Sequence, residues 1–289
     1  MRLRTAAIAV VLSAAFPLLA GYVTQDAWVV VAGHATGIGG RQFETTVYMT
    51  DASHSMNDVT LSFFPAGEPV ASPRSITLQL GPDQSGAIDV GPQLTGDAGA
   101  IGALRIHSTG SLLAEAHLFN RTPAEAPPQI GEVLNAIPAQ YAIGSGDFTV
   151  VPVHAGARYK LYAVETNGFP LYFSVASGTA DRRLLIRPHE ERSWDLAQVL
   201  PVAQVSSLRI TGINGSGKII VLGTAVAEHG KDFSAYEMML PARARHRMTW
   251  PEMTAYAAVA VAIAFTAFYR MWSDGRSRPS TREDARRST

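Results

Sequence analysis

The chain has 289 residues, its 24 Lys and Arg are balanced by 24 Asp and Glu, and it contains no cysteine. The lack of cysteine excludes disulfides, thiol chemistry, cysteine-ligated metals and lipid attachment to an N-terminal cysteine, so the fold must depend on ordinary apolar cores. Between Ala27 and Pro241 there are thirteen basic and nineteen acidic residues, and this mildly acidic charge argues against nucleic acid as a ligand.

The N-terminal residues have the layout of a secretory signal. Arg2 and Arg4 precede an apolar stretch from Thr5 to Ala20, and this order is typical of a signal peptide. Leu18 is larger than the residue that usually stands three positions before the cleavage point. Residues 1–22 are therefore expected to be a cleaved signal peptide or a retained signal anchor, and the chain is predicted to be exported.

Short segments rich in β-branched and aromatic residues, bounded by Gly, Pro, Asn, Asp or Ser, predict strands in two regions, 27–121 and 147–241. In the first region they are Trp28–Val31, Thr45–Met49, Val59–Phe64, Ser75–Leu80 and Ala103–His107. In the second they are Tyr159–Val164, Leu171–Val175, Leu184–Arg187, Leu208–Thr211 and Lys218–Ala225. Short strands at this spacing predict an all-β fold of two β-sandwich domains.

The two regions also match each other at several points, which predicts an internal duplication of about a hundred residues. The matches are His34-Ala35 and Arg41 with His154-Ala155 and Arg158; Ile88-Asp89-Val90 and Leu94 with Trp194-Asp195-Leu196 and Leu200; and Leu104-Arg105-Ile106 with Leu208-Arg209-Ile210. Residues 122–146 are rich in Pro and Ala. We expect them to form a linker, or a long connection packed along the first sandwich.

These features make the chain similar to the tandem immunoglobulin-like β-sandwich repeats of bacterial secreted and cell-envelope proteins. The resemblance depends on the turn after Tyr48, the segment from Asp89 to Leu94, the strand from Gly102 to Ile106, and their second-half matches. It implies a spacer, adhesin or assembly module, and it brings no catalytic residues.

The C-terminal region contains an uncharged run, Met253–Tyr269, flanked by Trp250 and Trp272. At about 1.5 Å of rise per residue a helix of this length reaches roughly 25 Å, and the tryptophans extend it to the headgroup level. We expect a transmembrane helix at 250–272. The basic tail, 273–289, is then expected in the cytoplasm, and the rest outside the cytoplasmic membrane.

Motifs for chemistry are weak. Gly212–Lys218 has the spacing of a phosphate-binding loop, but Ile219 stands where Ser or Thr should hold magnesium, so we expect a hairpin loop. His107 and His117 are expected on the two strands of a hairpin around Thr109 and Gly110, too far apart to share a metal. No nucleophile elbow is present. The sequence therefore predicts no catalytic residue, cofactor or metal.

Three residues are candidates for partner contact. Arg105 and Arg209 lie at matched positions of strands whose neighbouring residues are apolar, so both should point away from the core, toward solvent, a local salt bridge or a partner. Trp194 belongs to a group of aromatics with Tyr159, Tyr162 and Tyr172. We hypothesise a non-enzymatic, membrane-anchored interaction or scaffold protein with an envelope protein as partner. The alternative is a carbohydrate- or peptidoglycan-binding module, with or without hydrolase activity, and it requires an exposed aromatic platform.

Overall fold

The computed structural model of the chain describes residues 22–36, 42–121, 130–153, 158–200, 206–226 and 233–239. These residues are predominantly antiparallel β-structure, with the short helical turns α2 (Pro92–Thr95), η3 (Ala139–Tyr141) and α3 (Leu196–Val199). The all-β prediction is confirmed. The first-half strands are β1 (Val23–Thr36), β2 (Gln42–Asp51), β3 (Asn57–Pro65), β4 (Arg74–Leu80), β5 (Ser85–Asp89), β6 (Ala100–Arg121), β7 (Ile130–Asn135) and β8 (Ile137–Pro138). The second-half strands are β9 (Phe148–Pro152), β10 (Arg158–Glu165), β11 (Leu171–Ser177), β12 (Ala180–Ile186), β13 (Glu191–Asp195), β14 (Ser207–Gly215), β15 (Ile219–Val226) and β16 (Phe233–Glu237).

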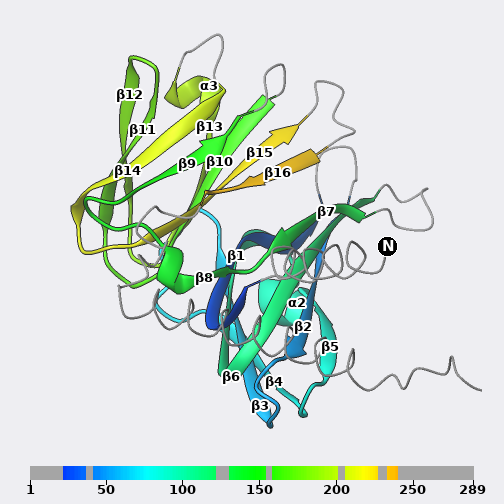
Figure 1. Cartoon of the computed structure of the whole chain (residues 1–289). Helices are drawn as coiled ribbons and strands as arrows, with labels where there is room; N and C mark the ends of the chain where they lie inside the picture. The colour runs from blue at the N-terminus through cyan, green and yellow to red at the C-terminus, as the bar shows by residue number, and fades with distance from the viewer. Residues whose placement is uncertain are drawn as a thin grey trace, which may run out of the picture. The chain divides into compact units, whose positions relative to one another are not determined.

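In the second half the strands form two four-stranded sheets, ordered β12-β11-β14-β9 and β13-β10-β15-β16 (Figure 1). Their inner faces meet in an apolar core. The ring of Phe173 on β11 lies 5.6 Å from that of Trp194 on β13, and the Tyr159 hydroxyl on β10 donates to the carbonyl of Pro152 on β9 at 2.5 Å. The alternation of buried and exposed residues along these strands produces this core, because every second side chain of a strand points to the same face.

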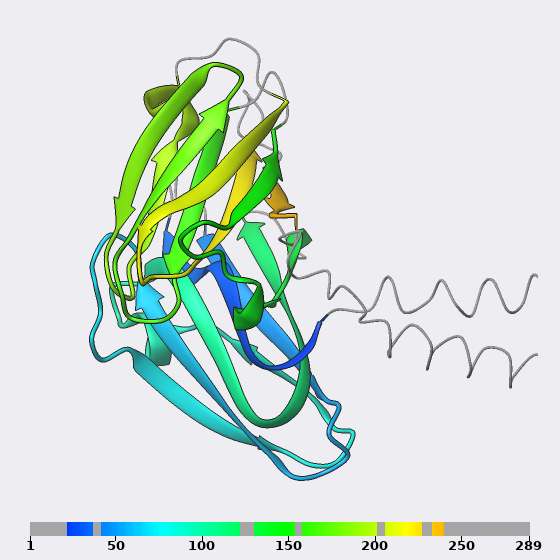
Figure 2. The same cartoon turned by 60° about the vertical axis from the view of Figure 1, so that its left-hand side comes forward.

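The first half is built around β6, a single strand of 22 residues. Its N-terminal part pairs with β1 and β3, and its C-terminal part pairs with β2 and β7. The predicted hairpin around Thr109 and Gly110 is therefore wrong: the chain curves at this point from one set of partners to another (Figure 2), and the two parts of β6 do not pair with each other. His107 pairs with Asp26 and Thr60, whereas His117 pairs with Thr46 and Val133.

The two halves follow the same order of strand pairings. The first-half series is β4-β3-β6-β1 and β5-β2-β6-β7, and it matches β12-β11-β14-β9 and β13-β10-β15-β16 when the two parts of β6 take the places of β14 and β15. Two sets of paired residues relate the halves: Leu61–Ile106 with Val175–Ile210, and Thr46–Asp89 with Lys160–Asp195. Leu61 on β3 lies 114 positions before Val175 on β11, and Thr46 on β2 lies 114 positions before Lys160 on β10, so both strands keep the same spacing from their counterparts.

The described part of the expected linker is not an extended spacer in this structure. Residues Ile130–Asn135 form β7, and Ile137–Pro138 form β8, which pairs with Ala27 and Trp28 of β1. Ala136 and Ile137 are buried. Residues 130–138 therefore pack along the first-half sheet, whereas Ile143 and Ser145 bridge Ile219 and Gly212 of the second half. Residues 122–129 lie outside the described ranges.

The halves also touch each other directly. Ala66 bridges Glu191 in parallel, and the backbone nitrogen of Gly67 donates to the carbonyl of Glu191 at 2.8 Å. The ring of Phe64 lies 5.7 Å from that of His189. The apolar residues of β1 from Ala27 to Ala32 are all buried, as are those of β15 from Ile219 to Leu222, so both faces of each strand are covered there.

In the part of the chain that the structure describes, no helix is both long enough and apolar enough to cross a membrane. The predicted signal at 1–22, apart from Tyr22, and the predicted helix and tail at 250–289 lie outside the described residues.

Candidate interaction surface

The outer face of the β12-β11-β14-β9 sheet carries exposed apolar side chains. Phe148 is 40 % exposed, Tyr172 50 %, Leu185 37 % and Ile213 37 %. Tyr172 and Leu185 are cross-strand partners, Ile213 precedes the partner of Tyr172 on β14, and Phe148 pairs with the residue two positions before Ile213. Neighbours at this spacing reach one another across a sheet. We call these four residues the aromatic face.

Arg209 lies within the aromatic face. Its guanidinium carbon is 4.3 Å from the centre of the Phe148 ring, which is the geometry of a cation–π contact. Leu208 and Ile210 on either side are fully buried, so the arginine points away from the core as predicted. A guanidinium stacked on an exposed ring offers a partner both charge and apolar area.

Arg105 occupies the corresponding place in the first half and is already paired. Its Nε and Nη2 donate to the two carboxylate oxygens of Asp26, each at 2.8 Å. These hydrogen bonds raise the pKa of Arg105. Asp26 and Phe148 occupy matching positions in the two halves. Each is paired with the residue that follows its arginine by two places, Asp26 with His107 and Phe148 with Thr211.

A second pair of positions shows the same contrast. Tyr172 and Leu185 correspond to Asp58 and Gln79, which are cross-strand partners on β3 and β4. The amide of Gln79 donates to the carboxylate of Asp58 at 3.0 Å. The first-half sheet thus presents polar pairs to solvent, and the second-half sheet presents apolar residues at the same register positions. A sheet face that only meets water would be expected to carry polar residues, as the first-half sheet does. The exposed apolar cluster of the second half is instead typical of an interaction site.

Trp194 lies elsewhere. It is partly buried on β13, with its ring edge-on to Phe173, and the Arg192 guanidinium is 5.5 Å from its ring centre. The predicted group of four aromatics is not a single platform: Tyr159 is only 4 % exposed, and burial raises the pKa of Tyr162 to about 12, with the Glu191 carboxyl group adding to the effect. Of the four, Tyr172 alone belongs to the aromatic face.

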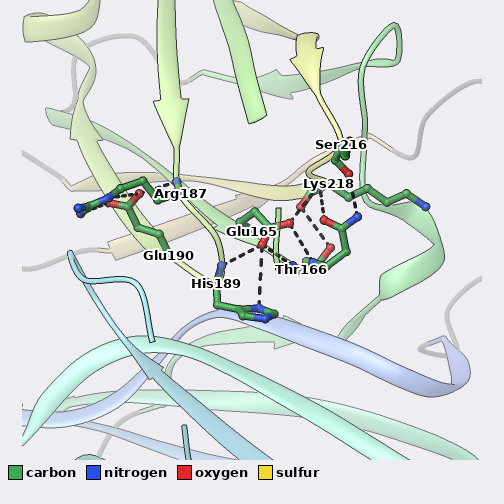
Figure 3. A network of polar contacts seen from close by, with 9 residues as sticks. Glu165, Thr166, Arg187, His189, Glu190, Ser216 and Lys218 are labelled. Atoms are coloured by element: carbon green, nitrogen blue, oxygen red, sulfur yellow. Dashed lines mark hydrogen bonds and ion pairs between the residues drawn. The ribbon is translucent and has the colours of Figure 1, made fainter. Parts of the chain in front are cut away.

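A buried carboxylate organises the loops at one end of the second half (Figure 3). The Glu165 side chain is 0 % exposed, and its oxygens accept hydrogen bonds from the backbone nitrogens of Asn167, Gly168, His189 and Lys218 at 2.8 to 3.2 Å. The acceptor thus ties together the loops β10–β11, β12–β13 and β14–β15. The loop with phosphate-binding spacing is closed by this protein carboxylate, and it joins strands of two different sheets, so the predicted hairpin loop is a connection between sheets.

The first half has the same arrangement at Asp51, which ends β2 as Glu165 ends β10. Its carboxylate accepts hydrogen bonds from the hydroxyl and backbone nitrogen of Ser53, the amide of Asn57 and the backbone nitrogen of Asp83. These hydrogen bonds, that of the Ser53 hydroxyl first, hold the pKa of Asp51 well below its usual value. Asp83 and His189 correspond in register, and both have a positive φ, 57° and 52°. In both halves, therefore, a buried carboxylate at the end of the strand holds the neighbouring loops through hydrogen bonds.

The contact between the halves contains a buried carboxyl group that, unlike Asp51 and Glu165, accepts no hydrogen bond. Glu191 is 1 % exposed, and neither of its side-chain oxygens has a hydrogen-bond partner. Burial, with the charge of the adjacent Glu190 adding to it, raises its pKa to about 8, and Lys160 acts in the opposite direction. Glu190, by contrast, accepts hydrogen bonds from the Arg187 backbone and guanidinium. Buried, shifted carboxyl groups often lie at functional sites, but among the described residues no group of three or more acidic or histidine side chains could hold a metal.

In comparisons with known proteins, no family model, no curated protein and no solved structure matches the chain.

Proposed function

We propose that the protein is a membrane-anchored, extracytoplasmic interaction or scaffold protein of the bacterial envelope that binds an envelope protein through the aromatic face. The observation that carries the proposal is the contrast between matched positions: Phe148 and Tyr172 stand where the first half has Asp26 and Asp58. The proposal includes export by the N-terminal signal and anchoring by the C-terminal apolar run.

The proposal also includes a common origin of the two halves as immunoglobulin-like repeats. Support comes from the shared order of strand pairings and from the buried acids Asp51 and Glu165 at the same register position. After a duplication, one copy can retain the solvated sheet face while the other acquires apolar contacts. Loops and sheet faces on a rigid sandwich are common sites of recognition.

The carbohydrate-binding alternative draws on the same residues. Phe148 and Tyr172 are exposed rings on one sheet, and such rings can stack on sugars. The aliphatic Leu185 and Ile213 beside them favour a protein partner, because the buried core of a protein interface is apolar and is enriched in aromatic residues and arginine.

We expect the double variant Tyr172→Asp, Leu185→Gln to lose its partner, since it copies the polar pair of the first half at the centre of the aromatic face. The measurement is cross-linking of the tagged full-length protein in intact cells of its host, followed by identification of what co-purifies. Recovery of a defined envelope protein should fall at least tenfold, because truncating an interface centre costs about 2 kcal/mol or more.

The matched control is Thr60→Asp, Thr77→Gln, which introduces the same two residues at an exposed, already polar pair of the first-half sheet. It should leave recovery unchanged. Recovery of cell-wall glycan in place of protein, lost with the aromatic-face variant, would favour the carbohydrate-binding module. A partner retained by both variants would contradict the assignment of the aromatic face.

A further inference from the structure

The first half holds an open cavity of about 340 Å³ between β1, β2, β5 and the start of α2. Its wall includes His34, Glu44, Thr46, Asp89 and Phe119. The hydroxyl of Thr46 donates to one carboxylate oxygen of Asp89 at 2.6 Å, and Glu44 stands between its cross-strand neighbours His34 and Phe119. The volume lies within the range of small-ligand sites, and the cavity combines an aromatic wall with carboxylates.

In the second half, an arginine of the protein itself binds the aspartate that corresponds to Asp89. Asp195 corresponds to Asp89, and Arg158 corresponds to Glu44, since each stands two positions before the residue that pairs with its aspartate. The guanidinium of Arg158 donates through Nε to the carboxylate of Asp195 at 3.0 Å. The second half therefore carries a cation against this aspartate, from the strand beside it.

The first half keeps the aspartate but replaces the arginine by a carboxylate. Among the described residues, no Lys or Arg side chain forms a salt bridge with Asp89. Glu44, which corresponds to Arg158, and Asp89 both line the cavity, together with the aromatic ring of Phe119. A planar guanidinium matches this lining, because it binds a carboxylate through directed N–H donors and stacks on an aromatic ring.

We propose that this cavity is a binding site for a guanidinium group supplied from outside the chain, either by a small alkylguanidine or by an arginine side chain of a peptide. The ligand would donate to Asp89 as Arg158 donates to Asp195, with its guanidinium plane against the ring of Phe119. The site is separate from the aromatic face and does not depend on the proposed function.

The test is a ligand-detected NMR titration of the full-length protein in detergent with n-propylguanidinium, and with n-propylurea as a probe of the same shape without charge. We expect the guanidinium to bind with a Kd of about 1 mM, typical of so small a ligand, and the urea to bind at least about tenfold more weakly. A blocked peptide, acetyl-Ala-Arg-Ala-amide, identifies the source: tighter binding than the alkylguanidine indicates an arginine side chain, and weaker binding indicates a free alkylguanidine.

Two variants and one control locate the site. Asp89→Asn should weaken binding at least about tenfold, as should Glu44→Arg, which copies Arg158 and fills the cavity from within. The control Asp195→Asn removes the matching carboxylate of the second half and should leave binding unchanged, and circular dichroism checks that each variant is folded. Equal binding of the urea, binding that survives Asp89→Asn, or no binding of n-propylguanidinium to the wild-type protein would overturn the proposal.

Discussion

Replacing the buried carboxyl group between the halves, Glu191→Gln, should stabilise the protein at alkaline pH and change little at pH 4 to 5. Neither oxygen of Glu191 is hydrogen-bonded and the side chain is 1 % exposed, so the ionised form is unfavourable there. Burial raises the pKa to about 8 from an ordinary value of 4.5. This difference corresponds to about 5 kcal/mol when the folded protein holds the charged form, as an order of magnitude.

The sign follows from where the proton is bound. The folded state binds the Glu191 proton more tightly than the unfolded state, so stability from this group is fully present below pH 4.5. It is lost progressively as the pH rises toward 8, and above that the ionised carboxylate destabilises the fold by the full amount. Glutamine has nearly the shape of the protonated acid and does not titrate, so its free energy of unfolding should not show this decline.

Urea unfolding of the full-length protein at pH 5, 7 and 9 measures the difference. The neighbouring Glu190 supplies the control, because its side chain is equally buried but accepts hydrogen bonds from Arg187. Glu190→Gln should destabilise the protein at pH 7 and 9, by about 1.5 to 3 kcal/mol, the range for a hydrogen bond to a charged group. If Glu191→Gln destabilised the protein at pH 9 to the same extent, Glu191 would have to be ionised and paired.

Much of the all-β character could be predicted because strand patterns are local. Segments such as Leu208–Thr211 and Leu171–Val175 alternate apolar and polar residues, and both lie within strands. The edge strands β5 and β16 were not predicted, since their short sequences are stabilised by pairing with a neighbour and not by their own pattern. The course of β6 was also missed: Gly110 signals a turn locally, but the pairing of its two sides with different strands depends on residues far along the chain.

The candidate surface was predictable only in part. Arg209 could be placed on a solvent face by alternation alone, and it is found there. Phe148 was not identified, because one exposed ring cannot be told from a buried one without knowing which strands flank it. Asp51 and Glu165 do leave a signal in the sequence, because they are two acids 114 positions apart at the ends of matched strands. Only their hydrogen bonds show why an acid is needed there.

Removing the buried acceptor of the second half, Glu165→Ala, should have the largest destabilising effect of any single change discussed. The variant would leave the backbone nitrogens of Asn167, Gly168, His189 and Lys218 without their acceptor. An unsatisfied buried donor costs about 1 to 3 kcal/mol. Because Lys218 also donates to the Asn167 side chain, and water can reach some of the loop, we expect about 3 to 5 kcal/mol in total.

Since domains of this size are stable by only about 5 to 15 kcal/mol, the loss should be visible as a lower urea midpoint at pH 7. The exposed acid Asp181 on β12 gives the matched control, and Asp181→Ala should change the free energy of unfolding by less than about 0.5 kcal/mol. Hydrogen exchange distinguishes a local from a global cause. If Glu165 fastens the three loops to one another, exchange in Glu165→Ala should accelerate first at the four donor nitrogens, while the β-strand amides of Phe173 and Ile210 keep their protection relative to global unfolding. Unchanged exchange at those four nitrogens would mean that other acceptors hold the loops, and the common buried acid of the two halves would then lose its structural explanation.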